Sequence, residues 1–350
     1  MIKRFTGQIG KLLTLILVIF SLPASAVNLP ESGVTGYVAE DDGFVSQSEA
    51  VATIANGAGQ SPWDLERIDA RQAWQVTTGA KDVLIAVLDT GIASDHETLK
   101  DKIVADINFT PSTTVSDRFG HGTHVAGIIA ARPGISADIT GLAYGASLLN
   151  VKVANDDGSV DAGTLAQGII WAVDNGAGVI NISLTISKPS PALEEAINYA
   201  WEKGHLIVAA AGNNFNTKPV YPAAYRNVIA VAATDNSGQL MSSSNRGDWV
   251  DVTAPGSNIY SALPGNGFAY KSGTSMATAL VSGEAALLYT IASDTNGDGK
   301  INDEVRAALE GGTELAISGM GKGQINVYQA IKLLSASREG SIANNPPVKP

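Results

Sequence analysis

The chain has 350 residues, of which 45% are hydrophobic and 16% are charged, and its formal net charge is −11. This length is ample for one large core or at most two domains. The acidic balance and the lack of any long run of Lys and Arg argue against a nucleic-acid partner. The absence of cysteine excludes disulfides, thiolate metal sites and a cysteine nucleophile.

The first 26 residues have the pattern of a secretion signal. A basic start precedes a short apolar run over 12–22, and Ala24-Ser25-Ala26 is an A-x-A cleavage site. The apolar run is too short to span a membrane. We therefore expect cleavage after Ala26, a secreted and extracellular protein, and no membrane span in the mature chain.

Three further segments follow the predicted signal. Residues 27–60 are polar, rich in Gly and Ser and weakly periodic, which is typical of a short pro-segment or linker. Residues 61–336 are expected to form the folded domain, which begins with a short helix over 68–76. The Pro-rich end, 337–350, is expected to be a tail.

The folded domain alternates apolar, β-branched segments with helical segments. Strands are predicted at 83–88, 147–153, 178–184, 205–211 and 227–233, and helices at 162–175 and 191–203. Continuous apolar strands of this kind are typical of a parallel sheet that is buried on both faces. We predict an α/β fold in three layers, with a mainly parallel, twisted sheet and helices on both faces.

Three reactive side chains lie where such elements begin or end. Asp89 follows the first strand, His121 stands between two glycines at the start of an apolar helix, and Ser275 starts a long apolar helix. Ligand sites of α/β sheets form at the carboxyl ends of the strands. A serine nucleophile needs a base, and the base needs an orienting carboxylate. Taken singly, the aspartate could be a turn residue and the serine a helix cap.

Two other patterns concern anion and metal binding. Asn213 follows a glycine at a strand end, where it is either a turn residue or a donor of its amide N–H to an anion. His121 and His124 are three residues apart without an intervening glutamate, which does not match the zinc pattern H-E-x-x-H.

Residues 294–302 match the first nine positions of a calcium-binding loop. Three side chains and one main-chain carbonyl would be the structural ligands of Ca²⁺: Asp294, Asn296, Asp298 and Lys300. The twelfth position, where a bidentate acid is expected, holds Val305, and Glu304 comes one residue early. The alternative is a solvated loop of Asp, Asn and Gly.

Four motifs resemble those of the subtilisin-like serine proteases, the subtilases or peptidase S8 family. They cover 87–92, 120–127, 211–213 and 273–277, and the resemblance extends from about residue 63 to about residue 334. It implies a secreted serine endopeptidase in which Ser275 attacks the scissile carbonyl and His121 transfers the proton. Asp89 would orient His121, and Asn213 with the Ser275 N–H would bind the oxyanion.

The same resemblance implies that an extended peptide pairs with two segments of main chain. The implied substrate-binding residues are Gly158, Ser159, Ser183, Leu184 and Thr185. Where the family has S-L-G-G, this chain has Ser183-Leu184-Thr185-Ile186. Losing these glycines should crowd the P1 pocket and favour modest P1 side chains.

Three further departures from the family pattern bear on activity and calcium. Ala279-Leu280 replaces Pro-His after the serine, a change that we expect activity to survive, because the proline is not a catalytic group. Thr98 stands where many relatives have a calcium-binding aspartate, so the 294–302 loop is a candidate substitute. Residues 27–60 are shorter than the usual prodomain.

Three other functions are compatible with parts of this sequence pattern. A catalytically impaired binding protein on the same scaffold is disfavoured by the four intact motif residues. A narrow-specificity processing protease is compatible with a crowded pocket. A nucleotide-binding domain is disfavoured, because no glycine-rich phosphate motif follows the first strand. We expect polypeptide substrates and a monomer.

Overall fold

The computed structural model describes residues 62–135, 139–314 and 318–344, with side chains as far as residue 336. All of these residues belong to one compact unit, Ala39–Pro350. The predicted signal peptide, the predicted pro-segment and the last residues of the predicted tail lie outside the described residues. In the described ranges, no helix has the length and apolar character that crossing a membrane requires.

Seven parallel strands form the central sheet, in the order β2-β3-β1-β4-β5-β6-β7. Their bounds are β1 Leu84–Asp89, β2 Ile103–Asn108, β3 Ser147–Lys152, β4 Ala177–Ile182, β5 Leu206–Ala210, β6 Val228–Thr234 and β7 Val252–Pro255. The five middle strands are almost completely buried, which explains their continuous apolar sequences.

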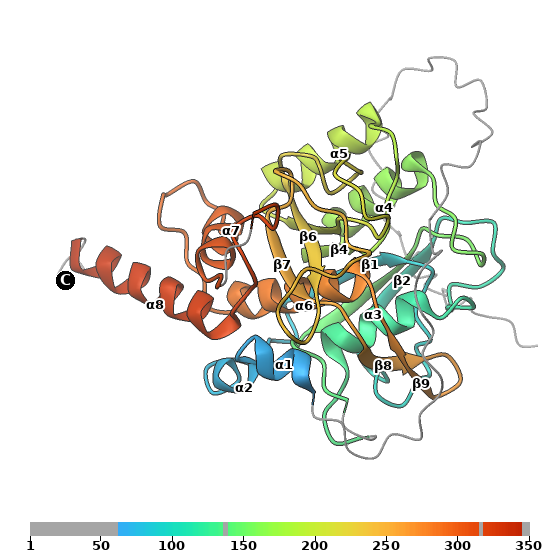
Figure 1. Ribbon diagram of the computed structural model, residues 1–350, viewed down its shortest axis with the longest axis horizontal. Helices are drawn as coiled ribbons and strands as arrows, with labels where there is room; N and C mark the ends of the chain where they lie inside the picture. Colours follow the sequence, from blue (N-terminus) through green and yellow to red (C-terminus); the bar gives the residue numbers. More distant parts are fainter. Residues whose placement is uncertain (1–61, 136–138, 315–317, 345–350) are drawn as a thin grey trace, which may run out of the picture. The chain divides into compact units, whose positions relative to one another are not determined.

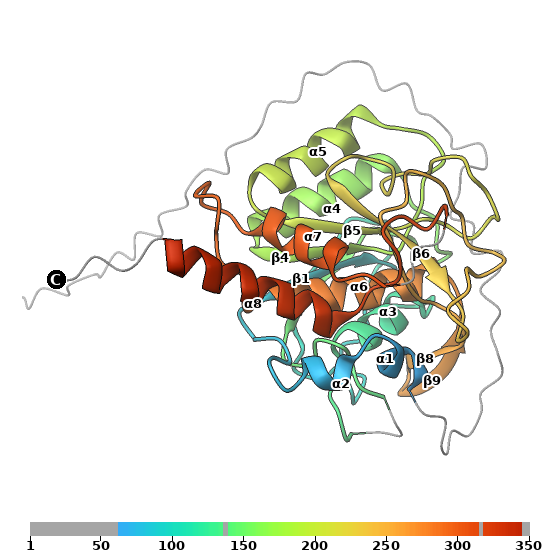
Figure 2. The ribbon, with the colours of Figure 1, turned by 60° about the vertical axis from the view of Figure 1, so that its left-hand side comes forward.

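Helices cover both faces of this sheet (Figure 1). On one face lie α4 (Ala162–Asp174) and α5 (Pro191–Glu202), and on the other lie α3 (His121–Ala130) and α6 (Thr274–Tyr289). Figure 2 shows the same two layers from another side. Each face of the sheet has its own hydrophobic cluster. Helix α6 is apolar nearly all round because it is enclosed between the sheet and other helices.

Smaller elements surround these layers. The hairpin of β8 (Ile259–Leu263) and β9 (Gly267–Lys271) packs on α3, and α8 (Val327–Asn344) packs on α2 and α7. The remaining helices are α1 Trp63–Arg67, α2 Ala70–Ala73 and α7 Asn302–Gly311. Figure 1 shows α7 and α8 together at one side of the sheet.

The predicted three-layer α/β fold is confirmed, and each predicted strand and each of the two predicted sheet-covering helices has its counterpart. The helix predicted over 68–76 is shorter than expected. Only α2, Ala70–Ala73, lies in this range, because Asp69 before it has a left-handed φ of 57° and residues 74–76 form a turn. A separate short helix, α1, precedes it. Helix α8 continues to Asn344, into the segment predicted as a tail.

Candidate active site

Asp89 and His121 are brought together by the end of β1 and the start of α3. Asp89 Oδ1 lies 2.7 Å from His121 Nδ1, and both side chains are buried. Because a carboxylate only accepts hydrogen bonds, Nδ1 is the donor, and Nε2 is then the basic nitrogen of the neutral ring. The same oxygen accepts the N–H of Thr90 at 2.7 Å, which fixes its position further.

Glycine is required beside the histidine because α3 passes very close to β1. A Cβ on Gly122 would lie 2.1 Å from the main-chain oxygen of Gly91 and 3.0 Å from Cβ of Asp89. Any side chain at this position would push the helix away from the strand. The glycine of the sequence motif therefore permits the short distance between Asp89 and His121.

Ser275 lies in the first turn of α6 and contacts Ser183, the residue after β4. Its Oγ donates to the main-chain oxygen of Ser183 at 3.2 Å, and Ser183 Oγ donates to the main-chain oxygen of Ser275 at 3.1 Å. In the β1–β4 pairing Leu88 stands opposite Ile182, so Asp89 and Ser183 are the next positions on neighbouring strands. The acid–histidine pair and the serine thus share one edge of the sheet.

The Ser275 hydroxyl is directed at Ser183 in this conformation. Because a hydroxyl has a single hydrogen, donation to His121 would require it to leave the Ser183 oxygen. Helices α3 and α6 pack against each other, and both begin at this edge. Ala279 and Leu280, which replace Pro-His, are completely buried inside a continuous α6, so the substitution leaves Ser275 in the first turn.

Asn213 is tied to the same helix start. Its Oδ1 accepts the N–H of Thr274 at 2.9 Å, and the N–H of Gly212 donates to Thr274 Oγ1 at 3.0 Å. Because Oδ1 is used in this way, the amide NH₂ of Asn213 is the part that can donate to a ligand. The side chain is only partly buried.

The segments predicted to bind substrate follow the two strands that flank β1: Gly158 and Ser159 come after β3, and Ser183–Thr185 come after β4. Gly158 adopts a left-handed φ of 86° in a tight turn, closed by a hydrogen bond of 2.8 Å from Asn155 N–H to Ser159 O. Leu184 is buried and Thr185 is partly buried. A Cβ placed on Gly212 would be 3.6 Å from Thr185 Cγ2, so the Thr185 methyl group lies beside Gly212 in the loop that carries Asn213.

Asp117 is a buried acid near His121 that sequence reasoning missed. It accepts five hydrogen bonds, from Thr90 Oγ1 (2.9 Å), Phe119 N (2.9 Å), Gly120 N (2.7 Å), Thr123 N (2.9 Å) and Thr123 Oγ1 (2.7 Å). It therefore connects the residue after Asp89 to the first turn of α3. Its place in a Ser-, Asp- and Gly-containing loop was the available signal, and this is also the signal of an ordinary turn.

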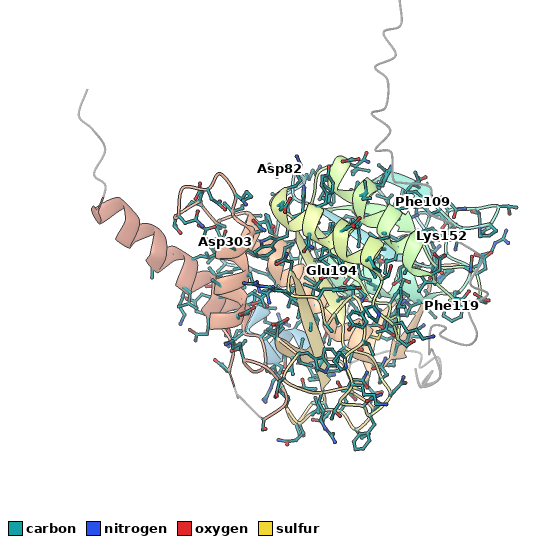
Figure 3. All side chains as sticks on the ribbon, turned by 90° about the horizontal axis from the view of Figure 1, so that it is seen from above. Asp82, Phe109, Phe119, Lys152, Glu194 and Asp303 are labelled. Carbon is teal, nitrogen blue, oxygen red and sulfur yellow. The ribbon has the colours of Figure 1, made fainter. Side chains whose placement is uncertain are left out.

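Lys152 is a second buried residue that the sequence did not single out. It ends β3, its register partner on β1 is Asp89, and its ammonium group donates to the main-chain oxygen of Thr90. It also forms an ion pair of 2.9 Å with Asp156. The pKa of Asp156 lies below its ordinary value, mainly because Lys152 donates a hydrogen bond to its carboxylate. Lys152 and Phe119 lie toward the same end of the molecule in Figure 3.

The 294–302 loop is compact and lies away from this site. Asp294 accepts the N–H groups of Gly297 (2.6 Å) and Gly299 (2.8 Å), and Asn296 Oδ1 accepts that of Asp298 (2.9 Å). These bonds form the turns that a loop with oxygen ligands requires, and oxygen is the ligand type that Ca²⁺ prefers. Asp303, just after the loop, lies far from Lys152 in Figure 3.

Two observations count against a dense metal site. Asp298 forms an ion pair of 3.1 Å with Lys300, and in the described ranges no group of three or more His, Cys, Asp or Glu is placed to hold a metal ion.

Thr98, at the position of the family's calcium ligand, is buried, and its hydroxyl lies 3.0 Å from His96 Nδ1. His124 is likewise used in packing, with Nε2 3.0 Å from the main-chain oxygen of Ala269.

Comparison with known proteins identifies the class. The sequence model of the subtilase family matches residues 80–313. Thermitase from Thermoactinomyces vulgaris is 44% identical over 272 residues, which are 76% of this chain and 94% of thermitase. Thermophilic serine proteinase from Bacillus sp. (strain AK1) is 44% identical over 264 residues, which are 74% of this chain and 64% of that protein.

Alkaline protease from Alkalihalobacillus alcalophilus is 40% identical over 269 residues, which are 77% of this chain and 69% of that protein. The chain therefore belongs to the subtilase family. It is a serine-type endopeptidase, and its substrates are polypeptides.

Proposed function

We propose that this endopeptidase uses Asp89, His121 and Ser275 as its catalytic triad and Asn213 as the oxyanion donor. The observation that carries the proposal is the 2.7 Å contact of Asp89 with His121, together with the Ser183–Ser275 pair at the neighbouring strand end. A buried acid–histidine pair and a serine in the first turn of a helix, at one sheet edge, are the parts that acyl transfer requires.

The proposed reaction uses these four residues. Ser275 Oγ attacks the scissile carbonyl while Nε2 of His121 takes its proton, and Asp89 stabilises the resulting imidazolium through Nδ1–H. The amide NH₂ of Asn213 and the N–H of Ser275 bind the oxyanion, because N–H groups of the first helical turn have no partner within the helix. His121 then gives the proton to the leaving amine, and water releases the acyl group by the reverse steps.

Alanine substitutions test these roles. We expect Ser275→Ala and His121→Ala each to lower kcat on the order of a million-fold, and the double variant to be no worse than either one. Asn213→Ala should lower kcat by about 10²- to 10³-fold with a smaller change in KM. Near-normal activity of His121→Ala, or losses that multiply in the double variant, would contradict the assignment.

We propose further that the peptide binds along Gly158-Ser159 and Ser183-Leu184-Thr185, with a narrowed P1 pocket. The 3.6 Å separation between the Thr185 methyl and a Cβ position on Gly212 supports this narrowing. A narrowed P1 pocket favours a narrow-specificity processing protease as the second candidate function. A catalytically impaired binding protein has no comparable support, since Asp89 and His121 are in contact.

Secretion, domain boundaries and the state of assembly are proposals that rest on the sequence pattern. The signal-like start supports export with cleavage after Ala26, a pro-segment over 27–60, a peptidase domain over 61–336 and a tail over 337–350. N-terminal sequencing of exported protein tests the first of these. We also propose a monomer, which light scattering of the purified protein tests.

We propose that the 294–302 loop binds one structural Ca²⁺ through Asp294, Asn296, Asp298 and the carbonyl of Lys300. The turns formed around Asp294 and Asn296 support it. Position 305 is a valine, but two acids just before it contact the loop: Glu304 accepts the N–H of Thr295 at 2.7 Å, and Asp303 accepts from Asn296 Nδ2 at 2.6 Å. The ion would link the end of α6 to the start of α7.

A further inference from the structure

One buried asparagine outside the recognised motifs holds the loop that carries Asn213. Asn245 lies between β6 and β7, has no solvent-exposed surface, and directs its polar groups at residues 211–216. A fully buried amide needs partners for its donor and its acceptor, and here all of them come from the main chain of one loop.

The contacts of Asn245 enclose this loop from one side. Its main-chain N–H donates to Gly212 O (2.8 Å), its Nδ2 donates to Ala211 O (2.7 Å), and its Oδ1 accepts the N–H groups of Asn214 (3.0 Å) and Asn216 (2.9 Å). The residues on either side of Asn213 are therefore fixed by a single residue, whose side chain bonds Ala211, Asn214 and Asn216.

The backbone of the loop is unusual in two places, and both lie next to Asn245. Phe215, between the two N–H groups that share Oδ1, has a left-handed φ of 52° and a side chain that is 60% exposed. A bulky residue seldom adopts this conformation unless its surroundings impose it. Gly212 has a φ of 90°, and a Cβ there would be 2.7 Å from Asn245 Nδ2.

Thr274 also holds this loop. Its N–H donates to Asn213 Oδ1, and its hydroxyl accepts the N–H of Gly212. Asn245 bonds the main chain around Asn213, whereas Thr274 bonds the Asn213 side chain itself. Together they leave Asn213 little freedom in main chain or amide, which is what a preorganised oxyanion donor requires.

We propose that Asn245 is a positioning residue of this endopeptidase, which acts on catalysis by fixing the 211–216 main chain and thereby the amide of Asn213. The proposal rests on the oxyanion role proposed for Asn213. Asn245 touches neither substrate nor reacting atoms, so its removal acts only through the geometry of that loop.

The test is Asn245→Ala, measured with a peptide amide substrate and with a peptide boronic acid, whose tetrahedral adduct occupies the oxyanion position. We expect kcat to fall by about 10- to 100-fold with KM within about twofold, because small misplacement of a catalytic donor has effects of this size. Boronic acid affinity should fall in parallel with kcat. Unchanged kcat, or a rise in KM alone, overturns the proposal.

A double variant separates positioning from general support of the fold. If Asn245 acts through Asn213, Asn213→Ala/Asn245→Ala should be about as active as Asn213→Ala, whereas independent losses that multiply overturn the proposal. Asn213→Ala alone tests the oxyanion role: full activity of that variant removes the proposed function and this inference with it. A loss in Asn213→Ala with none in Asn245→Ala removes the inference only.

Asn326→Ala is the matched control. Asn326 is 2% exposed and its side chain bonds Asp69, Glu314 and Gln329, so its loss removes a buried asparagine outside the proposed site. It should retain kcat and boronic acid affinity, and an equal loss there overturns the proposal. Should Asn245→Ala not fold by near-UV circular dichroism, Asn245→Asp, which keeps the accepting oxygen, is judged by the same criteria.

Discussion

At the scale of single residues, the candidate site depends on buried polar groups that take their partners from distant parts of the chain. Asp117 joins the end of β1 to the start of α3, and Asn245 joins the segment before β7 to the loop of Asn213. Each of these groups satisfies several main-chain donors or acceptors at once. Leaving such groups without partners costs about 1–3 kcal/mol each, so they fix the geometry strongly.

Glu284 is a buried residue of the opposite kind. It lies in the middle of α6, has no exposed surface, and neither carboxyl oxygen has a hydrogen-bond partner in the part of the chain that the structure describes. Burial raises the pKa of Glu284 well above its ordinary value. The folded protein therefore keeps the proton over a pH range in which the unfolded chain has lost it.

We predict that the raised pKa of Glu284 lowers the free energy of unfolding as the pH rises. Because the folded pKa is raised, the contribution of Glu284 is fully present below the ordinary pKa of a glutamate and is lost as pH rises toward the folded value. In the inactive Ser275→Ala background, Glu284→Gln should gain free energy of unfolding relative to its parent between pH 5 and pH 8, by about 1.4 kcal/mol for each pH unit over which only the unfolded chain is ionised. Urea unfolding at the two pH values measures this.

An exposed glutamate on α5 provides the control for this comparison. Glu195→Gln is the matched exposed substitution, because it removes a carboxyl group that the fold does not bury. A difference between Glu284→Gln and its parent that is identical at pH 5 and pH 8 would contradict a raised pKa of Glu284 in the folded protein.

The sequence identified the residues that belong to motifs and missed those that support them. Asp89, His121, Ser275 and Asn213 lie within two residues of a glycine at element ends and in motifs that resemble those of a family, a local signal that can be read directly. Asp117, Lys152 and Asn245 show at most the signal of an ordinary turn or strand end, because their importance comes from main-chain groups that only folding brings near them. Composition and spacing do not encode those contacts.

At the scale of elements, the end of β4 is expected to set the preference for the P1 side chain. The methyl group of Thr185 lies close to Gly212, whereas a glycine there would leave the space open. We predict that the protein cleaves peptides after Ala or Leu faster than after Phe, and that Thr185→Gly raises kcat/KM for Phe relative to Ala by about 10-fold or more.

A pair of variants at the same position separates the methyl group from the hydroxyl. Thr185→Ser removes the methyl group, so it should cleave after Phe faster than the unmodified protein but more slowly than Thr185→Gly. Thr185→Val keeps a methyl group and should retain the preference for Ala and Leu at P1. The measurement is a peptide library varied at P1. Equal cleavage after Phe, Leu and Ala by the unmodified protein would refute the crowded pocket.

The loop before α7 makes a prediction about calcium and thermal stability. If Asp294, Asn296 and Asp298 hold Ca²⁺, a chelator should lower the Tm of the Ser275→Ala protein by several degrees, since an ion that binds only the folded state stabilises it. Asp298→Ala should abolish this response. Asp235→Ala, in another Asp-containing turn, should leave the response intact. A Tm that chelator does not change contradicts calcium binding in this loop.

Elements were predictable where their environment is uniform. The strands of the sheet centre are continuous apolar runs because helices cover both faces, and these were found. The edge strands β2 and β7 were missed: β2 alternates exposed and half-buried residues and includes Asp106, and β7 has only four residues. Asp69, whose left-handed φ separates α1 from α2, gives no distinctive local signal in the sequence.

At the scale of the whole molecule, the sheet organises both stability and function. Two hydrophobic clusters on its two faces hold the strands, and the carboxyl edge carries Asp89 and Ser183, to which His121 and Ser275 are joined. This is the edge at which parallel α/β sheets bind ligands. The fold class could thus be predicted from the alternation of strands and helices, while the relative placement of α3 and α6 needed the three-dimensional structure.

The most direct test of the account is labelling of the 27–350 protein with a serine-directed fluorophosphonate, beside Ser275→Ala, with casein cleavage in parallel. The account predicts labelling of the unmodified protein alone, because only an activated serine reacts, and loss of activity on the order of a million-fold in the variant. Labelling without casein cleavage would favour the narrow processing protease. Equal labelling of Ser275→Ala, or none of a demonstrably folded unmodified protein, would contradict the assignment of Ser275 as the nucleophile.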